Sequence, residues 1–148
     1  MAKRKDVLTD SDYVALANLR YILRRFMDFS ASAAQREGLP SQQHQALLAI
    51  KGYRGEDPMT IGLLAERLLT APHSTSELVD RLVASGFVVR RADPGDKRRQ
   101  TLELTAHAED ILKRLSAIHL TEVREMAPRL IELLGDLQSD GSTAGDES

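Results

Sequence analysis

The sequence predicts a mainly α-helical fold that carries a single small β-hairpin. Apolar residues make up 42% of the 148 residues, but aromatic residues only 4%, so the core must consist largely of Leu, Ile, Val and Ala, which leans helical. Long segments near both chain ends repeat apolar residues every three or four positions, as amphipathic helices do. Between them, two short β-type segments flank a turn that contains Pro94 and Gly95. This length favours one domain with its own core.

Two helices are predicted in the first third of the chain, over about residues 10–36 and 41–51. Residues 9–12 (TDSD) resemble a capping box that starts the first helix. Gly38-Leu39-Pro40 ends it, and Ser41 is the expected N-cap of the second helix. The apolar residues that mark the first helix are Tyr13, Leu16, Leu19, Leu23, Phe26 and Met27.

A compact helical pair is predicted next. Thr60 is expected to cap a short helix over residues 61–68, and LTAP (69–72) forms a turn. A second helix follows over 73–85, and Gly86 ends it because glycine adopts the left-handed conformation easily.

A basic hairpin follows the pair. Residues 87–92 (FVVRRA) and 101–105 (TLELT) are predicted strands, and 93–100 (DPGDKRRQ) is the turn between them. Five basic residues and two aspartates lie between positions 90 and 99, although the net charge of the chain is −2. Charge is therefore unevenly distributed along the chain, which matters more for nucleic-acid binding than the sum.

The C-terminal part is predicted to be helical from residue 105. Pro128 is expected to kink this helix or divide it in two, since proline lacks an N–H and clashes with the preceding turn. Residues 138–148 are expected to form a disordered tail. The predicted organisation is an N-terminal helix within 1–36, a central region over 37–105, C-terminal helices over 106–137 and this tail, all in one compact domain.

The order helix, turn, helix, strand, basic turn, strand defines a winged helix-turn-helix. An α-helix fits the major groove of DNA, and a projecting hairpin tip can reach an adjacent minor groove, where narrow segments attract arginine. Positive charge at such a tip is favourable when an anionic partner receives it. The sequence therefore predicts binding to double-stranded DNA.

Residues 63–105 (LLAERLLTAPHSTSELVDRLVASGFVVRRADPGDKRRQTLELT) resemble the winged helix-turn-helix of the multiple antibiotic resistance regulator (MarR) family. The shared features are the LAERL and LVDRL helices, Gly86, the wing signature D-x-x-D-x-R and the closing LT. The resemblance implies that the recognition helix presents His73, Ser74, Ser76 and Glu77 to DNA. Two departures are Ala71 in place of a common Ser N-cap, so that Thr70 or a backbone group must cap the helix, and Glu77 in place of a basic or polar residue.

The resemblance also assigns wing contacts to Arg91, Asp96, Lys97, Arg98 and Arg99. It implies that Arg98 enters the minor groove, while Lys97 and Arg99 meet phosphates. Asp96 is expected to orient the arginines through an ion pair and to organise the turn. Arg91 is expected to pair with a wing aspartate such as Asp93, or to touch phosphate.

The terminal helices carry apolar stripes that one small winged domain cannot cover, which predicts a homodimer. Two-fold symmetry then places two recognition helices about 34 Å apart on a pseudo-palindromic operator. The resemblance implies the same dimer, held by N- and C-terminal dimerisation helices, and a repressor released by a small phenolic or anionic effector. The ligand-binding residues are unknown, although Arg20, Arg24 and Arg25 could supply an anion partner; a solvated face or intersubunit ion pairs are the more ordinary role.

Other classes of function are disfavoured. No catalytic constellation, phosphate-binding glycine loop or cofactor motif is present, so we expect no enzyme and no cofactor. His44, His107 and His119 fit no metal-ligand spacing, and the chain has no Cys. With neither an apolar span nor a secretory signal, a cytoplasmic protein without membrane contact is expected. The alternative that stays open is a winged-helix protein-interaction module that no longer binds DNA.

Overall fold

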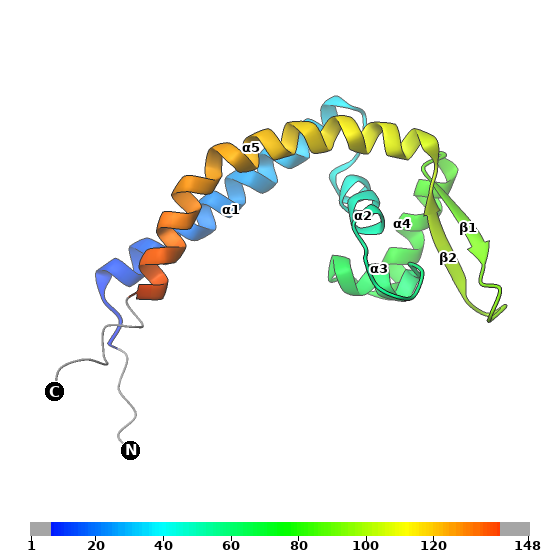
Figure 1. The fold of residues 1–148 in the computed structure, drawn as a ribbon, viewed down its shortest axis with the longest axis horizontal. Coiled ribbons are helices and arrows are strands. Elements are labelled where there is room, and N and C mark those ends of the chain that lie inside the picture. Colours follow the sequence, from blue (N-terminus) through cyan, green and yellow to red (C-terminus); the bar gives the residue numbers. More distant parts are fainter. Residues whose placement is uncertain (1–6, 140–148) are drawn as a thin grey trace, which may run out of the picture. The chain divides into compact units, whose positions relative to one another are not determined.

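The computed structural model describes residues 7–139, which contain five helices and a two-stranded sheet (Figure 1). These elements form two compact units. Unit 1 consists of the described residues up to Phe29 and from His119 onward, and unit 2 is Ser30–Ile118. No helix in the described range combines the length and the apolar character that a membrane span requires. The elements in chain order are α1 (Asp10–Arg36), α2 (Ser41–Lys51), α3 (Ile61–Leu68), α4 (Pro72–Ala84), β1 (Val88–Ala92), β2 (Gln100–Leu104) and α5 (Ala106–Ser139).

Helix α1 begins where the sequence predicts it. The Thr9 N–H donates to Asp12 Oδ2 over 2.8 Å, and the Asp12 N–H donates to Thr9 Oγ1 over 3.3 Å, which is the reciprocal pattern of a capping box. Within unit 1, Phe26 and Phe29 both meet the ring of His119 edge-on, with centroids 6.1 and 5.8 Å apart. These aromatic contacts pack α1 against α5 in that unit.

Helix α2 starts differently from the prediction. Pro40, in an extended conformation, is the N-cap, and Ser41 is already the first helical residue. The Ser41 hydroxyl accepts from Gln45 Nε2 over 3.2 Å and so does not cap the backbone. The prediction of a Ser41 N-cap is therefore wrong. The fixed φ of Pro40 sets the entry of the chain into the helix instead.

Helix α5 runs unbroken from Ala106 to Ser139 with Pro128 inside it. The prediction that Pro128 might divide this segment into two helices is therefore wrong. Its ring is exposed, so no neighbouring element crowds it, and a long helix can lose one hydrogen bond and bend. Residues 138 and 139, assigned to a tail by the sequence, belong to α5, and the rest of that tail lies outside the described residues.

Unit 2 is built around one apolar core. The buried residues come from every helix and from both strands, and Leu47, Leu64, Leu82 and Leu115 are completely buried. As predicted, Thr60 caps α3, because its Oγ1 accepts from the Leu63 N–H over 3.3 Å.

The sheet of unit 2 is antiparallel, with Val88 opposite Leu104 and Ala92 opposite Gln100. The Leu102 N–H donates to Met59 O over 2.9 Å, which ties the segment before α3 to β2. The hairpin is thus anchored along β2 to the segment that leads into α3.

Candidate nucleic-acid interface

Helix α4 divides cleanly into an inner and an outer face. Thr75, Leu78, Val79 and Leu82 are buried and follow the spacing i, i+3, i+4, i+7 of a core-facing stripe. The four residues predicted to meet DNA all lie outside that stripe: His73, Ser74 and Glu77 are exposed and Ser76 is half-buried. The core contacts of α4 therefore fix which side chains it presents outward.

The start of α4 has no side-chain cap. Its N-cap is Ala71, and Pro72 occupies the first turn, where its missing N–H costs nothing. Thr70 does not cap the helix as one prediction allowed. Its hydroxyl lies 2.7 Å from Thr75 Oγ1, which in turn donates to Ala71 O over 3.0 Å. The turn before α4 uses Leu69 in the left-handed conformation, with φ of 56°, to end α3.

Two of the predicted contact residues on α4 are engaged with each other. His73 Nε2 lies 3.2 Å from Glu77 Oε1, one helical turn apart. Glu77 thus keeps its acidic group on the outer face, beside a donor that carries a positive charge when protonated.

Helix α4 is joined to the wing, which we define as β1, β2 and the turn between them. Asp80 on the outer part of α4 forms an ion pair with Arg90 of β1. The side chain of Arg90 is largely covered, so this arginine is bound within the protein. The ion pair joins the wing to α4.

The wing turn uses its acidic residues to organise the backbone. Asp93 Oδ1 accepts from the Gly95 N–H over 2.9 Å, and Asp96 Oδ1 accepts from the Arg98 N–H over 3.0 Å. The Asp96 carbonyl also accepts from the Arg99 N–H over 3.0 Å. Among the described residues Asp96 forms no ion pair with an arginine, so the turn-organising role is confirmed and the arginine-orienting role is not found.

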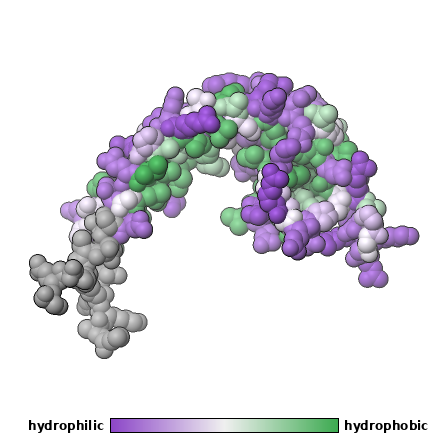
Figure 2. Space-filling view, viewed as in Figure 1, coloured by the Kyte–Doolittle hydropathy of each residue, from purple (hydrophilic) through white to green (hydrophobic). Residues whose placement is uncertain are grey.

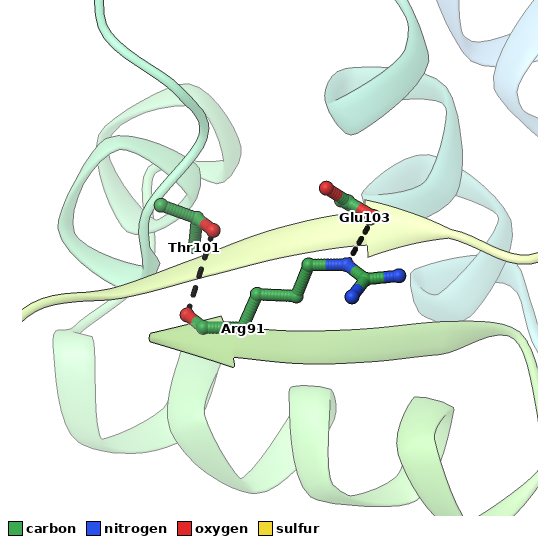
Figure 3. Close-up of polar contacts among 3 residues, drawn as sticks. All are labelled: Arg91, Thr101 and Glu103. Atoms are coloured by element: carbon green, nitrogen blue, oxygen red, sulfur yellow. Dashed lines mark hydrogen bonds and ion pairs between the residues drawn. The ribbon is translucent and has the colours of Figure 1, made fainter. Parts of the chain in front are cut away.

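Arg91 has a different partner from the one the sequence suggested. Its Nε lies 2.6 Å from Glu103 Oε2, while its backbone carbonyl accepts from the Thr101 hydroxyl over 3.5 Å (Figure 3). The predicted pairing with Asp93 is wrong, because Asp93 is committed to the turn. Glu103 is the diagonal neighbour of Arg91 across the hairpin, a position where long side chains meet.

Three basic side chains of the wing remain available. Lys97 and Arg98 are exposed, Arg99 is half-buried, and none of the three forms an ion pair within the described part of the chain. Figure 2 shows hydrophilic residues gathered over this hairpin end. Sequence reasoning missed Arg81, an exposed arginine on α4; projecting α4 as a helical wheel would have placed it beside Glu77 on the outer face.

The histidines suggest no alternative chemistry. His44 is buried in α2, His107 stacks on Phe87 with centroids 5.0 Å apart, and His119 packs against two phenylalanines. Across residues 7–139, no three His, Asp or Glu side chains cluster closely enough to hold a metal ion. Aromatic packing accounts for two of these histidines.

Comparisons with known proteins agree with this geometry. The sequence profile of the MarR family matches residues 37–99. YcgE of Bacillus subtilis, an uncharacterized HTH-type transcriptional regulator, is 31% identical over 131 residues, which span 85% of this chain and 82% of the relative.

Solved structures share the fold. AbsC, a MarR family transcriptional regulator from Streptomyces coelicolor, matches with a TM-score of 0.72 and 22% identity over 92% of this chain and 93% of its own. MepR of Staphylococcus aureus, in its complex with DNA, matches with a TM-score of 0.68 and 18% identity over 93% of this chain and 96% of its own. The chain therefore belongs to the MarR family of winged helix-turn-helix transcriptional regulators, which are not enzymes.

Proposed function

We propose that this chain binds a pseudo-palindromic site in double-stranded DNA as a homodimer, and that it represses transcription until a small ligand releases it. One observation carries the proposal. In unit 2, α4 buries its inner stripe and turns its polar residues outward, beside a wing whose Lys97 and Arg98 have no acidic partner among the described side chains. Phosphate is the partner that suits such unpaired cations. MepR, which has the same fold, has been solved in a complex with DNA, which supports the proposed DNA binding.

The dimer is supported by unit 1. Large apolar side chains of α1 and α5 are exposed there, including Leu16, Leu23 and Ile131. Contiguous exposed apolar surface marks an interaction site. A second copy of the same helices would cover it, and two-fold symmetry would then present two α4 helices to one duplex.

The effector is supported by a small cavity in unit 1. This cavity, of about 230 Å³, lies between α1 and α5 and is lined by Phe26, Met126 and charged residues that include Arg25 and Arg129. The aromatic ring of a ligand could contact the apolar residues, while the carboxylate of the same ligand pairs with an arginine. Of the three arginines that the sequence suggested as anion partners, Arg25 lines this cavity. A ligand that favours one arrangement of the dimer would lower DNA affinity by the linked free energy.

A salt titration tests the proposal. Duplexes selected from a random library by the full-length protein are used to measure the binding constant at several salt concentrations. If each subunit neutralises about four phosphates, the log–log slope should be about −7 for a dimer. A phenolic anion, 4-hydroxybenzoate, is then added. If such a ligand releases repression, the affinity of the protein for the duplex should fall.

The interaction-module alternative has its own supporting observation. Two of the five basic residues at the base and tip of the wing, Arg90 and Arg91, are held by Asp80 and Glu103, and Glu77 adds an acid to α4. A protein of this kind would give a flat salt dependence and no selected duplex. That outcome would replace the DNA-binding proposal.

A further inference from the structure

A cleft runs along the flank of α4 that faces away from the wing. We infer that this cleft seats one strand of the DNA backbone, with Arg81 as its phosphate contact. The inference rests on the proposed function and adds to it a second backbone contact, on the other side of the major groove from the wing.

The cleft belongs entirely to unit 2. It has a volume of about 440 Å³ and lies between α2 and α4. Its polar lining comes from Gln42 and Gln45 of α2, from Thr70 of the turn before α4, and from Ser74, Glu77 and Arg81 of α4. Five of these six side chains can donate hydrogen bonds, which suits an anionic occupant.

The position of the cleft relative to the wing follows from helix geometry. Successive residues of an α-helix are separated by about 100° around the axis, so Asp80 and Arg81 point to different flanks of α4. Asp80 pairs with Arg90 and therefore marks the wing flank, whereas Arg81 lines the cleft. Helix α4 is thus a ridge with the wing on one side and the cleft on the other.

A helix in the major groove lies between two sugar–phosphate strands. The wing lies beside one of them, and the cleft beside the other. Most protein–DNA hydrogen bonds go to phosphates and fix the position of the protein on the duplex. If α4 were held by backbone contacts on one flank only, it could tilt in the major groove. A contact on the second flank would fix how deeply α4 lies in the groove and which base pairs it faces.

Arg81 has the chemistry for that contact. It is exposed, and within the described residues its guanidinium forms no ion pair. A guanidinium binds phosphate through two parallel hydrogen bonds. Glu77, the acidic residue of the lining, has its Oε1 3.2 Å from Nε2 of His73, a residue outside the cleft lining.

The test compares Arg81→Ala with Lys113→Ala in the full-length protein. Lys113 is an exposed cation of unit 2 on α5 and is not part of the cleft, so both variants lose the same charge. We expect Arg81→Ala to bind the selected duplex about tenfold more weakly and to reduce the magnitude of the salt slope by about 2 per dimer. The relative affinities for single-base variants of the site should stay unchanged. Lys113→Ala should leave the slope at the wild-type value.

A neutral methylphosphonate placed in turn at each phosphate flanking the major groove provides a second readout. At one position on the strand away from the wing, the methylphosphonate should weaken DNA binding by the wild-type protein and leave DNA binding by Arg81→Ala unchanged. This comparison does not depend on the thermal stability of the variant. Equal slopes for the two variants, or a loss confined to one base pair, would overturn the inference while the proposed function stands. A flat slope for the wild-type protein would overturn the proposed function itself.

Discussion

The two units of the molecule use the same two helices in opposite ways. In unit 2, α1 and α5 contribute Ala34 and Leu115 to a closed core, and both are completely buried. In unit 1, no described side chain is buried at all, and large apolar residues of both helices are exposed. One chain therefore closes the core of unit 2, whereas unit 1 keeps large apolar side chains exposed.

Residue size follows the same division along α1. The part in unit 2 contains Ser30, Ala33 and Ala34, small residues that allow helices to approach closely. The part in unit 1 exposes long or aromatic side chains such as Tyr13 and Leu23. Burying that surface would contribute about 25 cal/mol per Å² of apolar area, which is the driving force that the proposed dimer would use.

The largest effect is expected from Leu115→Ala, which tests whether unit 2 carries the stability of the single chain. Leu115 is 0% exposed, so its truncation removes buried area and leaves a cavity. We expect a loss of about 2 to 5 kcal/mol in the free energy of unfolding, measured by urea titration. Leu134→Ala on the same helix, at a 47% exposed position, is the matched control and should cost much less when measured on separated monomers.

The next effect concerns unit 1. Leu23→Lys places a charge on its exposed apolar face, and burying that charge in a dimer would be costly. We expect the dissociation constant of the dimer to rise by about 100-fold, measured by sedimentation equilibrium, with the helical circular dichroism of unit 2 retained. Gln35→Lys adds the same charge at an exposed polar position of α1 in unit 2 and should change nothing. A Leu23→Lys protein that remains fully dimeric would remove the proposed role of unit 1.

The sequence was sufficient to predict most elements of unit 2 and the start of α1 in unit 1. Caps and breakers act locally, so the residues 9–12 box, Thr60 and Gly86 ended or began helices where expected, and the strands were placed to within one residue. Side-chain partners were harder. Asp93 was the predicted partner of Arg91 because it is near in sequence. The partner in the structure is Glu103, which only the hairpin register brings to Arg91.

The surface of unit 1 could not be divided by periodicity alone. Leu19 and Phe26, both counted in one apolar stripe, are half-buried, whereas Leu16 and Met27 of the same stripe are exposed. An apolar stripe that packs against two partners repeats every three or four residues, and so does a stripe that packs against one partner. The cleft beside Arg81 was likewise invisible in sequence, because α2 and α4 supply its two sides.

A smaller effect is expected within unit 2 from Arg98→Ala. Arg98 is exposed at the wing tip and has no ion-pair partner among the described residues, so the fold does not depend on its side chain. We expect DNA binding to weaken by about 1 to 3 kcal/mol in an electrophoretic shift titration, with an unchanged thermal midpoint. An unchanged affinity on a selected site would contradict the assignment of the wing contact.

The smallest effect is expected from Glu103→Gln, which separates side chains held inside the protein from those available to a partner. The Arg91–Glu103 pair is more than half exposed on both sides, and exposed pairs of this kind contribute about 0.2 to 1 kcal/mol. Stability should therefore change little. Because the substitution removes an acid and frees a guanidinium near the turn of the wing, DNA affinity should rise about two- to threefold at low salt, with a steeper salt slope. A fall in affinity would mean that the pair positions the wing, and that Arg91 acts within the protein instead of on phosphate.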